Sequence, residues 1–254
     1  MKKKRRHVAA AVGLLALLTI WEACVRILCI PLYVLPAPSN VGLALWTQGP
    51  ALLEHAAITL AEASLGMVIA LALALALGML MDACPAVKAS VYPVLVVTQT
   101  VPMIVLAPIL IIYLGFGMLP KILTVVLMCF FPIVVSFTDG MAQVEPGYIH
   151  LLHTYGARPW QVYAQVKAPA ALPSLFSGIR VAATYSVSGA VVGEWIGSQA
   201  GLGYYLLRVK NGYMLDRVFA CVIVIVLLSL LMNGAVQICQ RVCLPYLKNR
   251  RNEE

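Results

Sequence analysis

Long apolar runs separated by short polar turns constrain this chain more than any other feature. Of its 254 residues, 62% are hydrophobic and only 11% are charged, whereas soluble domains are about half apolar and a quarter charged. Backbone polar groups find no water in a bilayer core, so runs of this length are expected to be α-helical. The sequence therefore predicts an all-α integral membrane protein with one membrane domain, residues 1–254.

The apolar runs predict six membrane-spanning helices. Their expected positions are 8–20, 58–81, 92–114, 122–137, 172–196 and 215–238. The basic start and apolar run at 1–20 could also be a signal peptide. Glu22 and Arg26 follow without a clear cleavage site, and a retained first span is the reading we adopt. Their i, i+4 spacing predicts a local ion pair.

The distribution of cations predicts which loops lie in the cytoplasm. The N-terminus, residues 1–7, and the C-terminal tail, residues 241–254, are both basic, and no Lys or Arg lies between Arg26 and Lys88. Cytoplasmic loops carry the excess of Lys and Arg. Both termini are therefore expected inside, with residues 31–57 outside. Cations at span ends do not indicate a nucleic-acid partner.

The longest interval that could not cross a membrane is the polar loop 139–171. Residues 148–155 can be helical, Gly156 permits a tight turn, and Pro159 suits the start of a second short helix. Leu151, Leu152, Tyr155 and Trp160 give the loop an apolar side. An apolar patch on such a loop favours a protein partner. The alternative is an ordinary amphipathic surface loop.

Two of the predicted spans carry polar groups at mid-depth. The span 92–114 is interrupted by prolines and contains Gln99 and Thr100, while the span 172–196 contains Thr184 and Ser188. Such groups are tolerated where they pair or meet water. We expect these four residues to line a substrate path, with Glu194 near its outer mouth. Helix-to-helix hydrogen bonding is the competing interpretation.

The span 172–196 is also rich in small residues. Gly189 and Gly193 form a GxxxG motif, which predicts close helix packing. A pore-lining face is an equally favoured interpretation of this span, and the two could apply to opposite sides of one helix. Arg180 is expected to have a structural role. Glu62 is either a functional intramembrane carboxylate or a side chain that reaches interfacial water.

The loop 139–171 resembles the cytoplasmic signature loop of ABC importer permeases. Gly156-Ala157 stands at the family's glycine, and the segment 166–173 stands at its Leu-Pro ending, while His150, Leu151 and Leu152 replace the Glu-Ala-Ala triplet. The segments 99–102, 107–108, 115–117, 193–196 and 201–204 are similar to the subgroup that imports nitrate, sulfonates, taurine or heterocyclic vitamin precursors.

The resemblance implies a type I ABC importer permease with six transmembrane helices and a cytoplasmic coupling helix between spans four and five. That helix would dock on a separate ATPase subunit. The residues expected to make this contact are Leu151, Leu152, Tyr155, Gly156, Ala157 and Trp160. The resemblance also implies a second copy of the chain, an extracytoplasmic solute-binding protein, and a multi-pass location in the bacterial cytoplasmic membrane. Pairing with a paralogue instead of a second copy stays open.

The sequence does not favour catalysis or cofactor binding by the chain itself. It contains no G-x-x-x-x-G-K-[ST] motif, so ATP and Mg²⁺ are expected on the partner subunit. The seven cysteines show no C-x-x-C spacing and are expected to be free, buried thiols. No cofactor or metal site is predicted. A membrane-embedded enzyme and an ion-driven carrier are the rival classes.

The substrate is predicted from resemblance alone. The segments 129–132 and 193–195 look closest to importers of thiamine-pyrimidine precursors. Riboflavin, sulfonates or taurine, and nitrate are the alternatives.

Overall fold

The computed structural model describes residues 2–244, with side chains from residue 12 onward, and within them every regular element is helical. The predicted tail 241–254 extends past the described residues, as do the side chains of the basic N-terminus. The elements in chain order are α1 (Lys2–Ile27), α2 (Pro38–Thr47), α3 (Gly49–Ala83), α4 (Pro85–Thr98), α5 (Met103–Leu114), α6 (Met118–Ala142), α7 (Pro146–Thr154), α8 (Pro159–Val162), the π-helix η1 (Tyr163–Lys167), α9 (Ala168–Glu194), α10 (Leu202–Asn211) and α11 (Leu215–Cys243).

Several of these helices are long and apolar enough to cross a membrane. Within residues 2–244 they are α3, α6, the continuous stretch Pro159–Glu194 that ends in α9, and α11. The pair α4 and α5 qualifies together as a fifth span, bent by 102°. The predicted first span lies in α1, which is helical; because its first residues lie outside the part of the chain described with side chains, this span stays a prediction. A multi-pass helical protein is confirmed, and the count of six spans stays a prediction.

The centre of the fold is α6, which packs most extensively against α9 and next against α3. Two glycines of α9 allow its backbone to approach α6. A Cβ at Gly178 would lie 2.5 Å from the carbonyl oxygen of Pro132, and one at Gly193 would lie 3.0 Å from the Cα of Lys121. The predicted close packing along the GxxxG side of this span is therefore confirmed.

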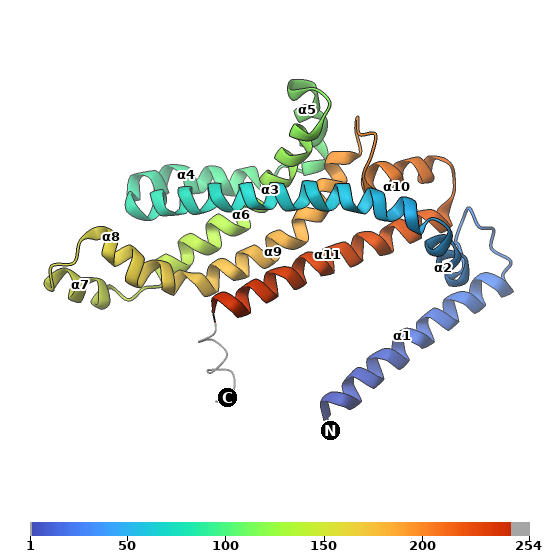
Figure 1. Ribbon diagram of the computed structural model, residues 1–254, viewed down its shortest axis with the longest axis horizontal. Helices are drawn as coiled ribbons and strands as arrows, with labels where there is room; N and C mark the ends of the chain where they lie inside the picture. The colour runs from blue at the N-terminus through green and yellow to red at the C-terminus, as the bar shows by residue number, and fades with distance from the viewer. Residues whose placement is uncertain (1, 245–254) are drawn as a thin grey trace.

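The predicted interruption of the span 92–114 is a sharp bend. Helix α4 ends at Thr98, and α5 begins after Pro102, whose extended backbone stops the preceding helix from continuing. Figure 1 shows α5 projecting away from the long axis of the bundle. The bend leaves Gln99 and Thr100 in the turn between the two helices.

The segment 31–57, which the sequence predicts outside, is more helical than a loop. It contains α2, and α3 begins at Gly49 instead of at 58 because Pro50 and the helix-forming residues after it continue directly into the apolar run. The predicted pair of Glu22 with Arg26 is present at 2.5 Å. Glu22 also accepts a hydrogen bond of 3.0 Å from the Ser39 backbone N–H, which joins α1 to the start of α2.

The seven cysteines are free thiols, but most are not buried. Only Cys129 and Cys221 are buried; the exposed ones are Cys24, Cys29, Cys239 and Cys243. The prediction of buried thiols is wrong for these four, because α1 has few neighbours and the outer face of α11 is uncovered in the single chain (Figure 1).

Candidate functional site

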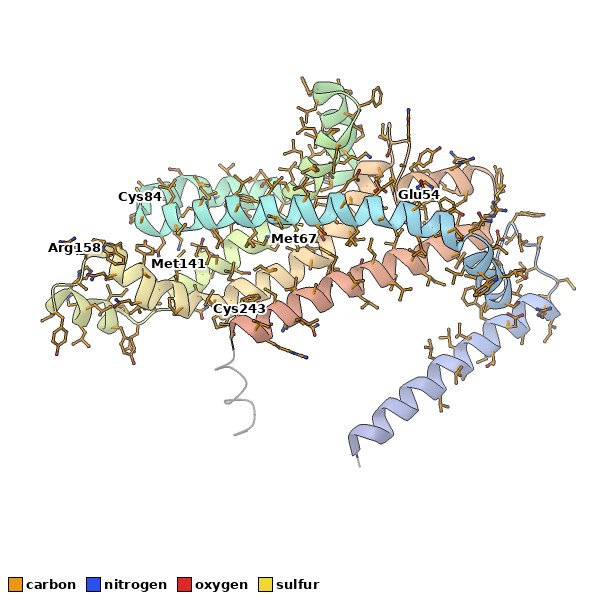
Figure 2. All side chains as sticks on the ribbon, in the orientation of Figure 1. Glu54, Met67, Cys84, Met141, Arg158 and Cys243 are labelled. Carbon is orange, nitrogen blue, oxygen red and sulfur yellow. The ribbon has the colours of Figure 1, made fainter. Side chains whose placement is uncertain are left out.

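The loop 139–171 lies at one end of the molecule and is built as the sequence predicts. Figure 1 shows α7 and α8 at the end opposite α2 and α10, and Figure 2 places Arg158 and Cys84 at the same end, far from Glu54. Helix α7 ends in a turn at Gly156, whose φ of +77° is left-handed. The Gly156 N–H donates to the backbone carbonyl oxygen of His153 at 3.0 Å, and the Ala157 N–H donates to that of Leu152 at 2.9 Å. This pattern closes the C-terminus of α7.

The tip of the loop presents apolar side chains that nothing in the single chain covers. Tyr155 is 81% exposed, Trp160 is 63% exposed and Leu151 is 54% exposed. Leu152 and Ala157 are half-buried beneath them. The six predicted contact residues are thus brought together on one helix–turn–helix, and large aromatic side chains so exposed are typical of a docking surface.

A clamp that the sequence reasoning missed anchors this loop to the bundle. Asp82, at the end of α3, accepts hydrogen bonds from the Tyr163 hydroxyl and from the Lys167 ammonium, the latter at 2.6 Å. Both donors lie on η1, where the Lys167 Nζ also lies 5.0 Å from the centre of the Tyr163 ring. π-Helical turns occur frequently at functional sites. The one signal of this anchor in the sequence was Asp82 itself, an acid at the end of a predicted span.

At the opposite end, a buried polar network holds the turn after α9. Glu194 is 1% exposed, and its carboxylate accepts hydrogen bonds from Thr59 at 2.7 Å and from the Gly203 N–H at 2.5 Å. The Thr59 hydroxyl oxygen also accepts from the Leu202 N–H at 2.8 Å. The first N–H groups of α10 are therefore satisfied by side chains from other helices.

The glycines of this turn make room for the carboxylate. A Cβ at Gly201, which has a φ of +106°, would lie 2.2 Å from the Glu194 carboxyl carbon, and one at Gly203 would lie 2.2 Å from the Val191 carbonyl oxygen. The Gly201 N–H donates to His55 Nδ1 at 3.1 Å. The segment 201–203 thus provides the space and a backbone donor for the Glu194 carboxylate, and we call it the seat of Glu194.

A second buried carboxylate lies in the same region. Glu62 forms an ion pair of 2.8 Å with Lys121 of α6, and the two side chains are only 3% and 12% exposed. The alternative in which Glu62 simply reaches interfacial water is therefore wrong, because α6 covers it and supplies a cation. The Glu62 Oε2 atom has no hydrogen-bond partner among the described residues.

The predicted path residues are exposed and belong to two different parts of the fold. Gln99 and Thr100 are exposed in the bend between α4 and α5, and Thr184 and Ser188 are exposed on the side of α9 that faces away from α6. Asn233 of α11, which the sequence analysis did not single out, donates to the Thr184 hydroxyl at 3.0 Å. Glu194 differs from these four because its carboxylate is enclosed by the network described above.

Within the described residues no group of three or more His, Cys, Asp or Glu side chains is arranged to hold a metal ion. The Arg180 guanidinium donates to Gln240 of α11, which fits its expected structural role.

Comparison with known proteins identifies the family. Residues 66–242 match the model of the binding-protein-dependent transport system inner membrane component. The chain belongs to this family. It is an ABC transporter permease, a transport subunit without an enzymatic activity of its own.

Curated relatives place the permease in the expected subgroup. It is 34% identical to the formylaminopyrimidine transport permease ThiX of Halalkalibacterium halodurans, over 98% of this chain and 100% of the relative. It is 30% identical to the riboflavin transport permease RibX of Chloroflexus aurantiacus, over 86% and 82% of the two chains. It is 29% identical to the taurine transport permease TauC of Escherichia coli, over 95% and 90%.

A solved structure supports the fold of the permease. The inward-facing MetNI methionine ABC transporter matches with a TM-score of 0.61 and 21% identity, covering 78% of this chain and 96% of that one. At this identity the match shows a shared fold, that of a type I importer permease.

Proposed function

We propose that the permease forms the membrane path of an ATP-driven importer for a thiamine-pyrimidine precursor or a similar heterocycle. The observation that carries this proposal is the full-length similarity to the formylaminopyrimidine permease. Riboflavin, a sulfonate such as taurine, and nitrate are the alternative cargoes, because relatives named for riboflavin and taurine also match most of the chain.

The substrate proposal is tested through the solute-binding protein that we propose as the partner of the permease. Isothermal titration of that purified protein with formylaminopyrimidine, riboflavin, taurine and nitrate should give the tightest binding for formylaminopyrimidine. Tightest binding of any of the other three would replace the proposed cargo and leave the importer assignment intact.

The loop 139–171 is proposed to be the cytoplasmic coupling element that docks on an ATPase subunit. Its exposed Tyr155 and Trp160 and its anchor on Asp82 support this role. ATP and Mg²⁺ would be bound by that partner. A second copy of the permease would complete the path, with the exposed polar face of α9 turned toward it.

The proposed orientation has six spans, cytoplasmic termini and an outer turn between α10 and α11. Single cysteines at the exposed Asn211 and Glu145 test it in a background without native thiols. An impermeant maleimide applied to intact cells or spheroplasts should label position 211 and spare position 145. The reverse pattern would invert the whole topology.

The exposed face of α9 is proposed to line the path through Thr184 and Ser188, together with Gln99 and Thr100 of the bend and Glu194 bracing the outer mouth. Ser188→Trp should therefore block transport while the complex still assembles, because Ser188 is exposed in the single chain. The matched variant Ser186→Trp should prevent assembly, because Ser186 is 0% exposed and cores tolerate overpacking poorly. A fully active Ser188→Trp transporter would remove α9 from the path.

A further inference from the structure

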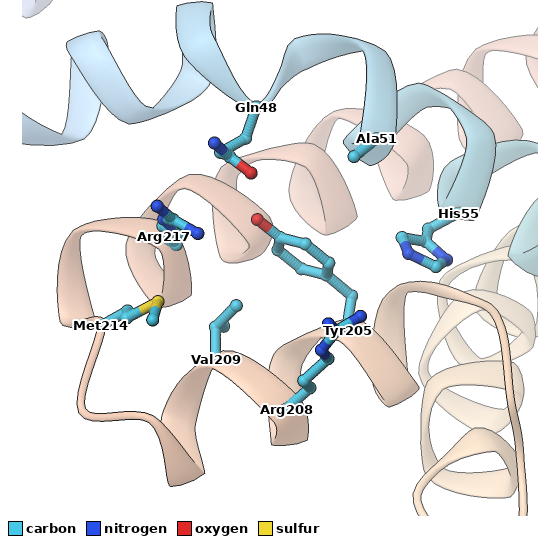
Figure 3. Close-up of a pocket in the computed structure, with 8 residues that line it drawn as sticks. All are labelled: Gln48, Ala51, His55, Tyr205, Arg208, Val209, Met214 and Arg217. Carbon is cyan, nitrogen blue, oxygen red and sulfur yellow. The ribbon is translucent and has the colours of Figure 1, made fainter.

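A pocket with both polar and apolar lining lies at the end of the molecule opposite the loop 139–171. It is formed where the start of α3, one side of α10 and the start of α11 meet, and its cavity has a volume of about 290 Å³. The side chains that surround it in Figure 3 come from Gln48, Ala51, His55, Tyr205, Arg208, Val209, Met214 and Arg217.

A buried hydroxyl without a hydrogen-bond partner points into this pocket. Tyr205 is only 6% exposed, and its hydroxyl has no partner among the described residues. Figure 3 shows this hydroxyl pointing into the cavity toward Gln48. Buried hydroxyls are nearly always hydrogen-bonded, so an orphan aimed into a cavity indicates a missing acceptor.

The charges around the cavity favour an anion as that acceptor. The guanidinium groups of Arg208 and Arg217 both face it. The permease's described ion pairs involve other cations, namely Arg26, Lys121 and Lys167. Two acids lie close to the lining residues, Glu54 beside His55 and Asp216 beside Tyr205, but neither of them lines the cavity. Arginine pairs of this kind suit the oxygens of a phosphate group.

The position of the pocket relates it to the membrane surface. Helices α3 and α11, two of the candidate spans, both begin beside it. Trp46 and Tyr213, which flank it in sequence, are 87% and 75% exposed. Exposed Trp and Tyr at the ends of spans are typical of the lipid headgroup level.

We propose that this pocket binds the phosphate group of an anionic phospholipid in the membrane leaflet at this end of the spans. The phosphate accepts hydrogen bonds from Tyr205, Arg208 and Arg217, and the acyl chains extend along the apolar faces of α3 and α11. Basic pockets between membrane helices recognise anionic headgroups through the same chemistry. This lipid would fasten α10, and with it the seat of Glu194, to α3 and α11.

The test is native mass spectrometry of the intact transporter in detergent, titrated with phosphatidylglycerol and, separately, with phosphatidylcholine. Arg217→Gln should weaken phosphatidylglycerol binding by about tenfold, the loss expected for one charge-assisted hydrogen bond. Tyr205→Phe keeps the ring and removes only the hydroxyl, and it should weaken binding by about three- to tenfold. Lys210→Gln is the matched control, because this exposed cation of α10 does not line the pocket.

Each remaining outcome contradicts the proposal. Equal binding by the wild type, Arg217→Gln and Tyr205→Phe would mean that the pocket holds no lipid. Competition by inorganic phosphate at equal concentration would identify a site for a free anion. Unchanged lipid binding together with weaker capture of the purified solute-binding protein would assign the pocket to protein docking.

Discussion

Lys121→Met is expected to lower the free energy of unfolding of the permease by about 3–5 kcal/mol, because it removes one partner of a buried ion pair. Glu62 would remain 2% exposed, with one carboxylate oxygen already lacking a partner. Among the described residues the ion-pair partner of Glu62 is Lys121, and the buried carboxyl group of Glu194 in the same region cannot replace that cation. Thermal or denaturant unfolding of the purified permease in detergent measures the loss.

The double variant Lys121→Met with Glu62→Gln should recover most of that stability, since replacing both partners of a buried pair is often nearly neutral. The control is Lys210→Met, which removes an exposed cation at the same end of the molecule and should leave stability within about 0.5 kcal/mol of the wild type. If Lys121→Met and Lys210→Met behaved alike, the ion pair would not stabilise the fold.

Gly156→Val is expected to abolish transport and the stimulation of ATPase activity in a permease that still inserts into the membrane. The φ of Gly156 is +77°, a conformation that a β-branched residue adopts only with strain of about 1–3 kcal/mol. No atom lies within 4 Å of the position that its Cβ would occupy. The expected loss of transport therefore comes from distortion of the turn that positions Tyr155 and Trp160, and not from a steric clash.

Gly147→Val provides the matched comparison in the same loop. Gly147 lies at the start of α7 without a positive φ, and an added Cβ would meet only the Glu145 carboxylate oxygen at 3.8 Å. This variant should retain most of the transport measured with the reconstituted complex. Full activity of Gly156→Val in the same assay would disprove the coupling role of the turn.

Local signals in the sequence predicted the loop and the spans well. Gly156 and Pro159 marked the turn and the second short helix because each restricts the backbone within a few residues. The apolar runs located most of the long helices because burial in lipid requires continuous apolar surface. Pro102 predicted an interruption, but not its angle of 102°, since that angle depends on what the two halves pack against.

Features that depend on distant partners were not predictable. Glu62 and Lys121 are 59 positions apart, and Asp82 and Lys167 are 85 positions apart. Only the packing of α3 against α6, and of η1 near the end of α3, brings these groups together. The pocket beside Tyr205 was missed for the same reason, because the residues that line it come mainly from three helices, α3, α10 and α11.

The glycine contacts between α6 and α9 have a mechanical consequence. At Gly178 and Gly193 the two backbones meet without intervening side chains, so neither helix can slide past the other without a collision between main chains. Helix α6 enters the loop 139–171 and α9 leaves it. A force applied to that loop would therefore act on both helices together. The ends of α6 and α9 that lie farthest from the loop carry Lys121 and Glu194.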